Sequence, residues 1–141
     1  MKFILGLLTC VVGSITNCGT DSLFTITKLD QNPFSDVLPN QNVSLTLLYT
    51  SPEEIAGGSV ETSITYNFIP FQPSVEDLCS VVMCPIHAGE NDGSTSYMFP
   101  VDLSGTIIVQ IKWFDTTGRL LLCIKSTLKA VKPSRMVWKF V

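Results

Sequence analysis

The chain has 141 residues, which is the length of one ordinary domain. Hydrophobic residues make up 45% of it and charged residues 15%. This balance excludes a disordered chain, because disordered segments are poor in apolar residues and rich in charge. The formal net charge of -3 disfavours a nucleic-acid-binding protein, because such proteins carry a basic surface.

The N-terminus has the pattern of a secretory signal peptide. A positive start at Met1–Lys2 precedes an apolar run, Phe3–Gly13, which is followed by small residues. The run is too short to span a bilayer, which takes about 20 apolar residues. We predict a signal peptide over residues 1–14, cleaved between Gly13 and Thr16, and a protein that is secreted or delivered to the endolysosomal lumen. A buried N-terminal strand is the alternative interpretation.

After the signal peptide, alternation of apolar and polar residues predicts β-strands, rich in β-branched and aromatic residues. The alternating runs cover residues 22–29, 42–50, 60–68, 107–113 and 120–128. Turn residues separate them, including Asn91–Gly93 and a hairpin loop at Thr116–Gly118. One helical turn could form at Ser51–Ala56. Short strands at this spacing predict an all-β sandwich or barrel over residues 15–131.

Two of these runs, at Leu47–Leu48 and at Ile107–Val109, are apolar on both faces. A closed sandwich needs only one apolar face for each strand. We therefore expect the surplus apolar surface to line a cavity.

Acidic and basic residues are unevenly distributed. Between Ile15 and Ile111 there are eleven acids and one base, whereas from Lys112 onward there are seven bases and one acid. The bases either coat the solvent face of the last hairpin or meet anionic lipid surfaces, where each contributes about 1 kcal/mol. In a C-terminal extension over residues 132–141, Trp138 suits a membrane interface, and a short packed strand is the alternative.

Five cysteines are present, and Cys10 leaves with the predicted signal peptide. The other four are expected to form disulfides, because the secretory route is oxidising. Four cysteines permit three pairings. Spacing favours a bond between Cys79 and Cys84, which closes a small loop, and one between Cys18 and Cys123. A zinc site is the alternative, but the spacing lacks paired C-x-x-C motifs.

The same route makes Asn42 an acceptor for N-glycosylation, because it begins the tripeptide Asn-Val-Ser. Candidates for catalysis are few. His87 is the only histidine, and neither a G-x-S-x-G motif nor a phosphate-binding glycine loop is present. We interpret the acid pairs Glu53–Glu54 and Glu76–Asp77 as solvated turn residues. We therefore expect no enzyme, no metal site and no cofactor.

One segment, Ile69–Gly89, has the sequence IPFQPSVEDLCSVVMCPIHAG and resembles the ML lipid-recognition domains. The shared pattern is a Pro-Phe pair, a proline and acidic loop, a cysteine, a short gap, then CPI and a glycine. Further matches are Phe99–Val101, Ile107–Asp115, Gly118 and Leu121–Cys123. The resemblance extends over residues 17–131.

This resemblance implies an immunoglobulin-like β-sandwich of two antiparallel sheets with a lipid cavity between them. It also implies the two disulfide pairs favoured by spacing. It places Pro70, Phe71 and Val101 at the mouth of the cavity. The aromatic residue that follows the mouth valine in sterol-binding members is absent, because Leu103 or Ser104 stands there. This difference weakens a sterol assignment.

The family further implies a protein that binds a lipid and transfers phospholipids such as phosphatidylglycerol and phosphatidylinositol between membranes. Sterol transfer is one alternative, and presentation of a lipid without transfer is another. The expected partners are a phospholipid or sterol ligand and, transiently, a membrane surface, and we expect a monomer. The predicted lipid contacts are Tyr66, Phe68, Pro70, Phe71, Met98, Val101, Ile107 and Trp113. Core packing is the alternative role for five of them, which are Tyr66, Phe68, Phe71, Met98 and Trp113.

Overall fold

The computed structural model describes residues 14–98 and 104–131 of the chain. The predicted signal peptide up to Gly13, Val101 and the extension over residues 132–141 lie outside these ranges. The elements are β1 (Ser14–Asn17), β2 (Thr25–Asn32), β3 (Asp36–Val37), β4 (Asn42–Ser51), β5 (Gly58–Tyr66), β6 (Ile69–Pro70), β7 (Ser74–Asp77), the 3₁₀ helix η1 (Leu78–Ser80), β8 (Gly89–Met98), β9 (Gly105–Asp115) and β10 (Leu120–Ala130).

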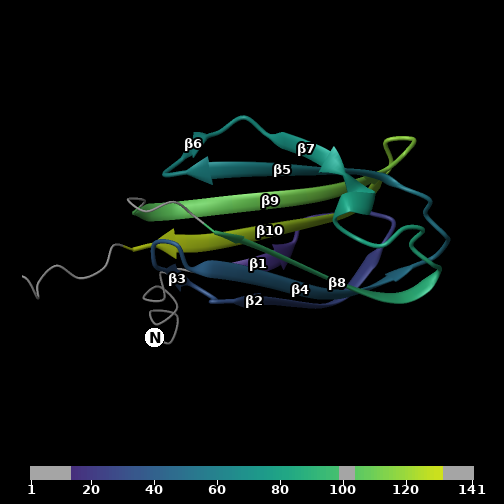
Figure 1. Cartoon of the computed structure of the whole chain (residues 1–141), viewed down its shortest axis with the longest axis horizontal. Helices are drawn as coiled ribbons and strands as arrows, with labels where there is room; N and C mark the ends of the chain where they lie inside the picture. Colours follow the sequence, from purple (N-terminus) through teal and green to yellow (C-terminus); the bar gives the residue numbers. More distant parts are fainter. Residues whose placement is uncertain (1–13, 99–103, 132–141) are drawn as a thin grey trace, which may run out of the picture.

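Hydrogen bonding divides these strands into two sheets that lie face to face (Figure 1). The larger sheet has the order β1-β10-β9-β5-β6, with β3 paired to β10 and β7 paired to β5. The smaller sheet has the order β2-β4-β8. The pairing is antiparallel except for the short contact of β3 with β10. The predicted sandwich of two antiparallel sheets is therefore confirmed.

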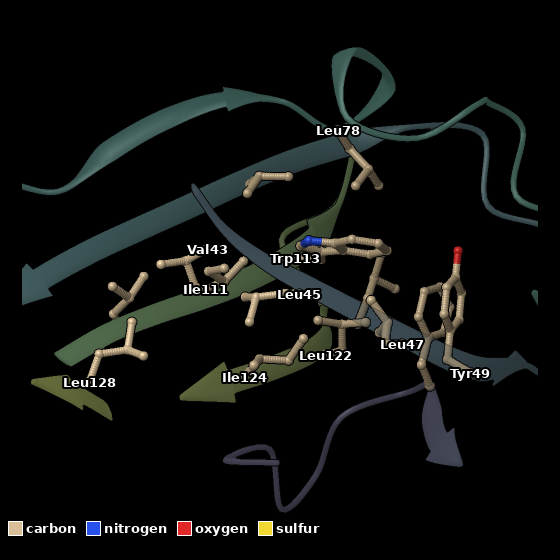
Figure 2. Packing of buried hydrophobic residues seen from close by; sticks show 14 of the residues in the cluster. Val43, Leu45, Leu47, Tyr49, Leu78, Ile111, Trp113, Leu122, Ile124 and Leu128 are labelled. Carbon is tan, nitrogen blue, oxygen red and sulfur yellow. The ribbon is translucent and has the colours of Figure 1, made fainter. Parts of the chain in front are cut away.

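The core lies between the facing sides of the sheets, where strand alternation turns apolar residues inward. Figure 2 shows β4 crossing over β9 and β10, with Leu45 and Leu47 directed at Ile111 and Trp113. Tyr49 stands edge-on to Trp113, with ring centroids 5.7 Å apart. Burial, with the charge of Asp92 adding to it, raises the pKa of Tyr49 to about 12. Each of these large side chains contributes about 1.5–3 kcal/mol through burial.

One side of the sandwich is closed by the chain itself. After β1, the amide of Leu23 donates to the carbonyl of Leu120 at 3.1 Å, and the amide of Phe24 donates to that of Leu121 at 2.8 Å. The chain then crosses into β2 of the smaller sheet. The Phe24 ring stacks on Tyr49 with a centroid distance of 5.0 Å, which joins this crossing to the core.

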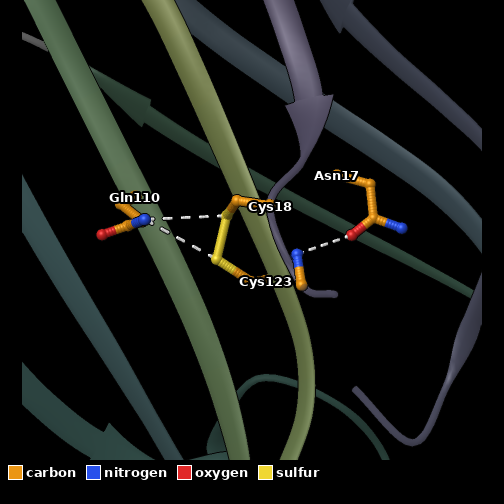
Figure 3. The surroundings of a disulfide bond; sticks show 5 residues. Asn17, Cys18, Gln110 and Cys123 are labelled. Carbon is orange, nitrogen blue, oxygen red and sulfur yellow. Dashed lines mark hydrogen bonds between the residues drawn. A yellow bond between two sulfur atoms is a disulfide. The ribbon is translucent and has the colours of Figure 1, made fainter. Parts of the chain in front are cut away.

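Two disulfides have the pairing that spacing favoured. The Cys18–Cys123 bond joins the end of β1 to β10 across a sequence separation of 105 residues, and Cys79–Cys84 closes a loop with a separation of 5. Figure 3 shows the first bond beside β9, where Gln110 Nε2 lies 3.7 Å from both sulfurs. The long-range bond therefore lies on the outer face of the larger sheet.

The hairpin between β9 and β10 turns around the buried carboxylate of Asp115. Its Oδ1 accepts hydrogen bonds from the amides of Thr117 and Arg119, each at 2.9 Å, and Arg119 Nε donates to its Oδ2 at 2.9 Å. Burial alone would raise the pKa of Asp115, but the hydrogen bonds from Thr117 and Arg119 outweigh it and hold that pKa well below its usual value. Arg119 also pairs with Glu53, so this acid is not simply a solvated turn residue.

The predicted turn at Asn91–Gly93 is wrong, because these residues lie inside β8 and pair with β4. Gly93 stands opposite Leu47, and a Cβ at Gly93 would lie 3.3 Å from Leu47 Cδ2 and 3.7 Å from the Trp113 ring. A glycine here lets β8 approach the core closely, which explains a turn-like residue within a strand.

Two strand boundaries and one predicted helical turn also differ from the sequence predictions. The strand predicted over residues 60–68 ends at Tyr66, because Asn67 and Phe68 have positive φ angles of 49° and 69°. The first long strand after β1 covers Thr25–Asn32 instead of 22–29. Residues 51–56 form no helical turn, and Ile55 makes an isolated bridge with Ile86.

The surplus apolar residues Leu48 and Ile108 point outward and do not line a space between the sheets. Leu48 is 38% exposed on the smaller sheet, and Ile108 pairs with Thr65 and Thr127 on the outer side of the larger one. Lys112, Lys125 and Lys129 share that outer side with Gln110 and Cys123. These lysines therefore occupy a solvent-facing side of the last hairpin, and their contact with lipid surfaces stays a prediction.

The two disulfides are expected to differ in their contribution to stability. Replacing Cys18 and Cys123 by serine should lower the free energy of unfolding by about 5 kcal/mol, because the bond closes a long loop in the unfolded chain. Replacing Cys79 and Cys84 should lower it by about 2 kcal/mol. Urea denaturation of the two double variants measures both values, and equal losses would contradict this account.

Candidate functional site

A cleft lies between the edges of the two sheets on the side away from the β1 to β2 crossing. One wall is formed by β5 and β7, and the other by β8. The cleft encloses a cavity of about 380 Å³. This volume is in the lower part of the range of about 300–1,000 Å³ that is typical of small-molecule sites. We call it the edge cleft.

The floor of the edge cleft is apolar. It consists of Ile107, Val109 and Ile111 on β9, whose side chains alternate toward the smaller sheet. Ile64 lies opposite Val109, and Tyr66 lies opposite Ile107 on the neighbouring strand β5. The pairing of β5 with β9 therefore creates a continuous apolar surface at the bottom of the cleft.

A smaller space of about 60 Å³ continues from the edge cleft toward the core. Trp113 and Leu47 line it, and it shares Thr62, Thr95 and Ile111 with the main cavity. The apolar floor thus reaches the centre of the sandwich.

The rim of the edge cleft is polar. The register pairs Ser74 with Thr62 and Glu76 with Val60, so Ser74 and Glu76 share the inward side of β5 and β7. Thr95 of β8 lies on the opposite wall. It pairs with Leu45 of β4, so both side chains point to the inward side of the smaller sheet. Glu76 is the only charged group among the described residues that line the two spaces.

A chain of hydrogen-bonded polar groups starts at Tyr97 in the β8 wall of the edge cleft and runs inward between the two sheets. The hydroxyls of Tyr97 and Ser126 are 3.4 Å apart, Ser126 Oγ donates to Gln31 Oε1, and Gln31 Nε2 donates to the carbonyl of Phe34 at 2.8 Å. Burial raises the pKa of Tyr97, and its hydrogen bond with Ser126 opposes this effect. The Tyr97 phenol therefore stays neutral at physiological pH and gives the β8 wall of the cleft a polar group without a charge.

The end of the cleft is bordered by a tight hairpin between β5 and β6. Its two central residues, Asn67 and Phe68, both have positive φ, as a two-residue turn of this kind requires. Asn67 Oδ1 accepts from the amide of Thr106 at 2.9 Å, and Tyr66 Oη accepts from the amide of Ser104 at 3.0 Å. These bonds hold the hairpin against the start of β9. Phe68 is 83% exposed at its tip.

The structure brings four of the sequence-predicted contact residues together at the edge cleft: Tyr66, Phe71, Met98 and Ile107. Trp113 lines only the deeper space. Phe68 and Pro70 are exposed on the hairpin and do not line the cleft. Val101 lies outside the described residues, and Asn42 is exposed at the first position of β4.

Val109 belongs to the run that was expected to line a cavity, but sequence reasoning missed several other lining residues, among them Thr62, Ile64 and Ile111. Strand alternation could have found these three, because they share a face with Tyr66 and Ile107 at spacings of two. Thr95 and Tyr97 had no such signal, because the alternation along β8 is mostly polar. Glu76 was interpreted as a solvated turn residue. It is solvent-exposed, but it lies in strand β7, and its register directs its side chain to the inward side.

A second hollow, of about 430 Å³, lies on the outer side of the smaller sheet. Its lining includes the ion pair of Lys28 with Asp30, at 3.7 Å, together with Asp92 and the exposed Met83. Three charged side chains make this surface less suited to an apolar ligand than the edge cleft. We therefore take the edge cleft as the candidate site.

Residues that could bind a metal ion are not grouped in the described structure. No cluster of three or more His, Cys, Asp or Glu residues occurs within residues 14–98 and 104–131. His87 is exposed between η1 and β8. In the same described ranges, no helix has the length and apolar character needed to cross a membrane.

Comparison with known proteins identifies the family. The model of the ML domain matches residues 13–130. A comparison with curated proteins gives no match. Among solved structures, a Niemann-Pick type C2 protein from Japanese carpenter ant is similar, with a TM-score of 0.66 and 11% identity over 83% of this chain and 98% of that chain. Chicken MD-1, solved in complex with lipid IVa, has a TM-score of 0.60 and 12% identity over 83% of this chain and 88% of that chain. The family match extends over well more than half of the sequence, and the chain therefore belongs to the ML domain family.

Proposed function

We propose that the protein holds one lipid in the edge cleft and transfers lipid between membranes. The observation that carries this proposal is the apolar floor of the cleft, formed by β5 and β9 and left open between the sheet edges. Each buried CH₂ group of an acyl chain contributes about 0.8 kcal/mol, so lipids leave a bilayer slowly without a cavity to receive them. Such transfer needs no bond to be made or broken, and the function is therefore not enzymatic.

The similar structures support a lipid as the ligand class. Chicken MD-1 was solved with lipid IVa bound, and it shares this fold with the chain. The expected cargo is a phospholipid such as phosphatidylglycerol or phosphatidylinositol. Sterol transfer is the nearest alternative, and a module that presents a lipid without transferring it is another.

The two disulfides support a place of action in an oxidising compartment. We propose that the protein is exported through its N-terminal signal peptide and works outside the cell or in an endolysosomal lumen. The exposed side chain of Asn42 leaves room for a glycan on this route.

The hairpin at the end of the cleft supports a transient membrane contact. Phe68 and Ile69 are 83% and 61% exposed, and Phe71 both lines the cleft and is 51% exposed. Phe68 also adopts a left-handed conformation that is uncommon for a bulky residue, and such strain is found where a side chain is held in place for function. We propose that the hairpin tip enters the membrane while the neighbouring cleft exchanges its lipid.

The transfer activity is tested by exchange of a fluorescent phospholipid between donor and acceptor vesicles. The protein should accelerate exchange in proportion to its concentration, and unlabelled sterol should compete if sterol shares the site. No acceleration over heat-denatured protein would contradict the proposal. Retention of the protein with its lipid on one vesicle population would favour the presenting module.

Filling the edge cleft should weaken lipid binding without unfolding the protein. Ile64→Trp places an indole over the apolar floor, and lipid affinity should fall by about tenfold or more, which requires a loss of only about 1.4 kcal/mol. Thr65→Trp is the matched control, because Thr65 points to the outer side of the same strand. Titration with a fluorescent lipid measures both affinities, and equal losses would place the ligand elsewhere.

Removing the exposed ring at the hairpin tip should slow transfer and weaken vesicle binding but preserve the affinity of the cleft for its lipid. Phe68→Asn keeps a residue that accepts positive φ, so the turn is retained. Vesicle binding should weaken by about tenfold, in line with the loss of a buried aromatic side chain. Met83→Asn is the control, because Met83 is 88% exposed but lies beyond η1. An unchanged transfer rate for Phe68→Asn would remove the hairpin from the membrane contact.

A further inference from the structure

The rim of the edge cleft carries one charge, and its position suggests a role in lipid selection. Glu76 borders both the main cavity and the deeper space. It lies directly opposite Val60, which is 3% exposed in the core, so the antiparallel register directs both side chains to the inward side. The neighbours Val75 and Asp77 point to the outer side instead. Glu76 is therefore the one acid of β7 that faces the edge cleft, where its side chain is exposed at the rim.

The surroundings of Glu76 offer hydroxyl groups but no positive charge. Ser74 and Thr62 stand beside it on the same side of the larger sheet, and Thr95 stands on the facing wall. No lysine, arginine or histidine is among the described lining residues of either space. Within the described part of the chain, the Glu76 side chain also makes no hydrogen bond or ion pair. Its carboxylate thus keeps its capacity to accept a hydrogen bond from a ligand.

A carboxylate in this position distinguishes between headgroups by charge. An uncharged headgroup with a hydroxyl can donate to Glu76, and such bonds to a charged acceptor are stronger than neutral ones. The phosphodiester of an anionic phospholipid offers no donor of its own and meets a like charge without a neighbouring cation. The headgroup hydroxyls of phosphatidylglycerol and phosphatidylinositol can donate to Glu76 as well, so the like charge of the phosphodiester is the effect that distinguishes the two classes of lipid.

We propose that Glu76 is a specificity-determining residue of the edge cleft, which disfavours anionic phospholipids relative to uncharged lipids that carry a hydroxyl group. The proposal rests on the proposed function, because it assumes that a lipid occupies the cleft. It bears on the cargo, since phosphatidylglycerol and phosphatidylinositol are anionic and a sterol is an uncharged alcohol. Glu76 thus shifts the balance away from the expected phospholipid cargo and toward the sterol alternative.

An inward charge on an edge strand has another possible role, because it prevents sheets from pairing edge to edge. That role concerns self-association and does not depend on the ligand. The ratio of the uptake of two lipids separates the two roles, because protection of a sheet edge leaves the affinity for each lipid unchanged.

The test uses the full chain produced through a secretory pathway and vesicles of zwitterionic phosphatidylcholine. The vesicles contain traces of either fluorescent phosphatidylglycerol or a fluorescent sterol, so that the vesicle charge hardly changes. Glu76→Gln keeps the size of the side chain and removes its charge. It should raise uptake of phosphatidylglycerol relative to sterol by about threefold, the size expected for one charge near a protein surface. The change should shrink at high salt because ions screen it.

Asp77→Asn provides the matched control, because Asp77 carries the same charge on the same strand but points to the outer side. It should leave the ratio unchanged. Ser74→Lys adds a cation on the inward side and should shift the ratio in the same direction as Glu76→Gln. An unchanged ratio in Glu76→Gln, or an equal shift in Asp77→Asn, would overturn the proposal while wild-type transfer stands. Absence of uptake by the wild-type protein would overturn the proposed function as well.

Discussion

The two sheets of this sandwich are joined along one side and left unpaired along the other, and the site depends on this asymmetry. On the joined side, Leu23 and Phe24 bond to β10 before the chain enters the smaller sheet. On the other side, no backbone hydrogen bond connects β7 with β8 within the described residues. Because the facing edges are unpaired here, Ile64 and Tyr66 of β5 remain partly exposed, while Ile107 and Val109 of β9 are buried at the bottom of the opening. The edge cleft is the space that results.

The remaining features of the fold keep the cleft in this form. The loop closed by Cys79–Cys84 carries the chain from β7 across to β8 at one end of the edge. The hairpin held by Tyr66 and Asn67 borders the other end. Between them the polar groups of Tyr97, Ser126 and Gln31 span the interior, so the two sheets are held at a set distance by hydrogen bonds as well as by packing.

Much of the fold could be predicted from the sequence, because period-two alternation is a direct consequence of strand geometry. The apolar faces of β4 and β9 followed from this signal, and the hairpin at Thr116–Gly118 followed from its turn residues. The disulfide pairing followed from spacing. β8 was missed because its outward residues are polar and Gly93 resembles a turn signal, although that glycine is needed for close approach to Leu47 and Trp113.

The site was predicted less completely, for a physical reason that Phe68 and Glu76 illustrate. Alternation assigned Phe68 to the face of Tyr66, but two positive φ angles end the strand and place the ring at an exposed tip. Glu76 has the composition of a solvated loop, and only its register with Val60 turns it toward the cleft. Local pattern specifies which residues alternate, whereas the pairing of distant strands determines which face encloses a cavity.

The central claim is that a lipid lies between the β5–β7 edge and β8. Photo-cross-linking with a lipid that carries a photoactivatable acyl chain tests it most directly, followed by mapping of the labelled peptides. The account predicts labels on β5, β8 and β9, with Ile64, Met98 and Ile107 among the labelled residues. Labels on the outer side of the smaller sheet, around Leu48 and Met83, or no labelling above a heat-denatured control, would contradict it.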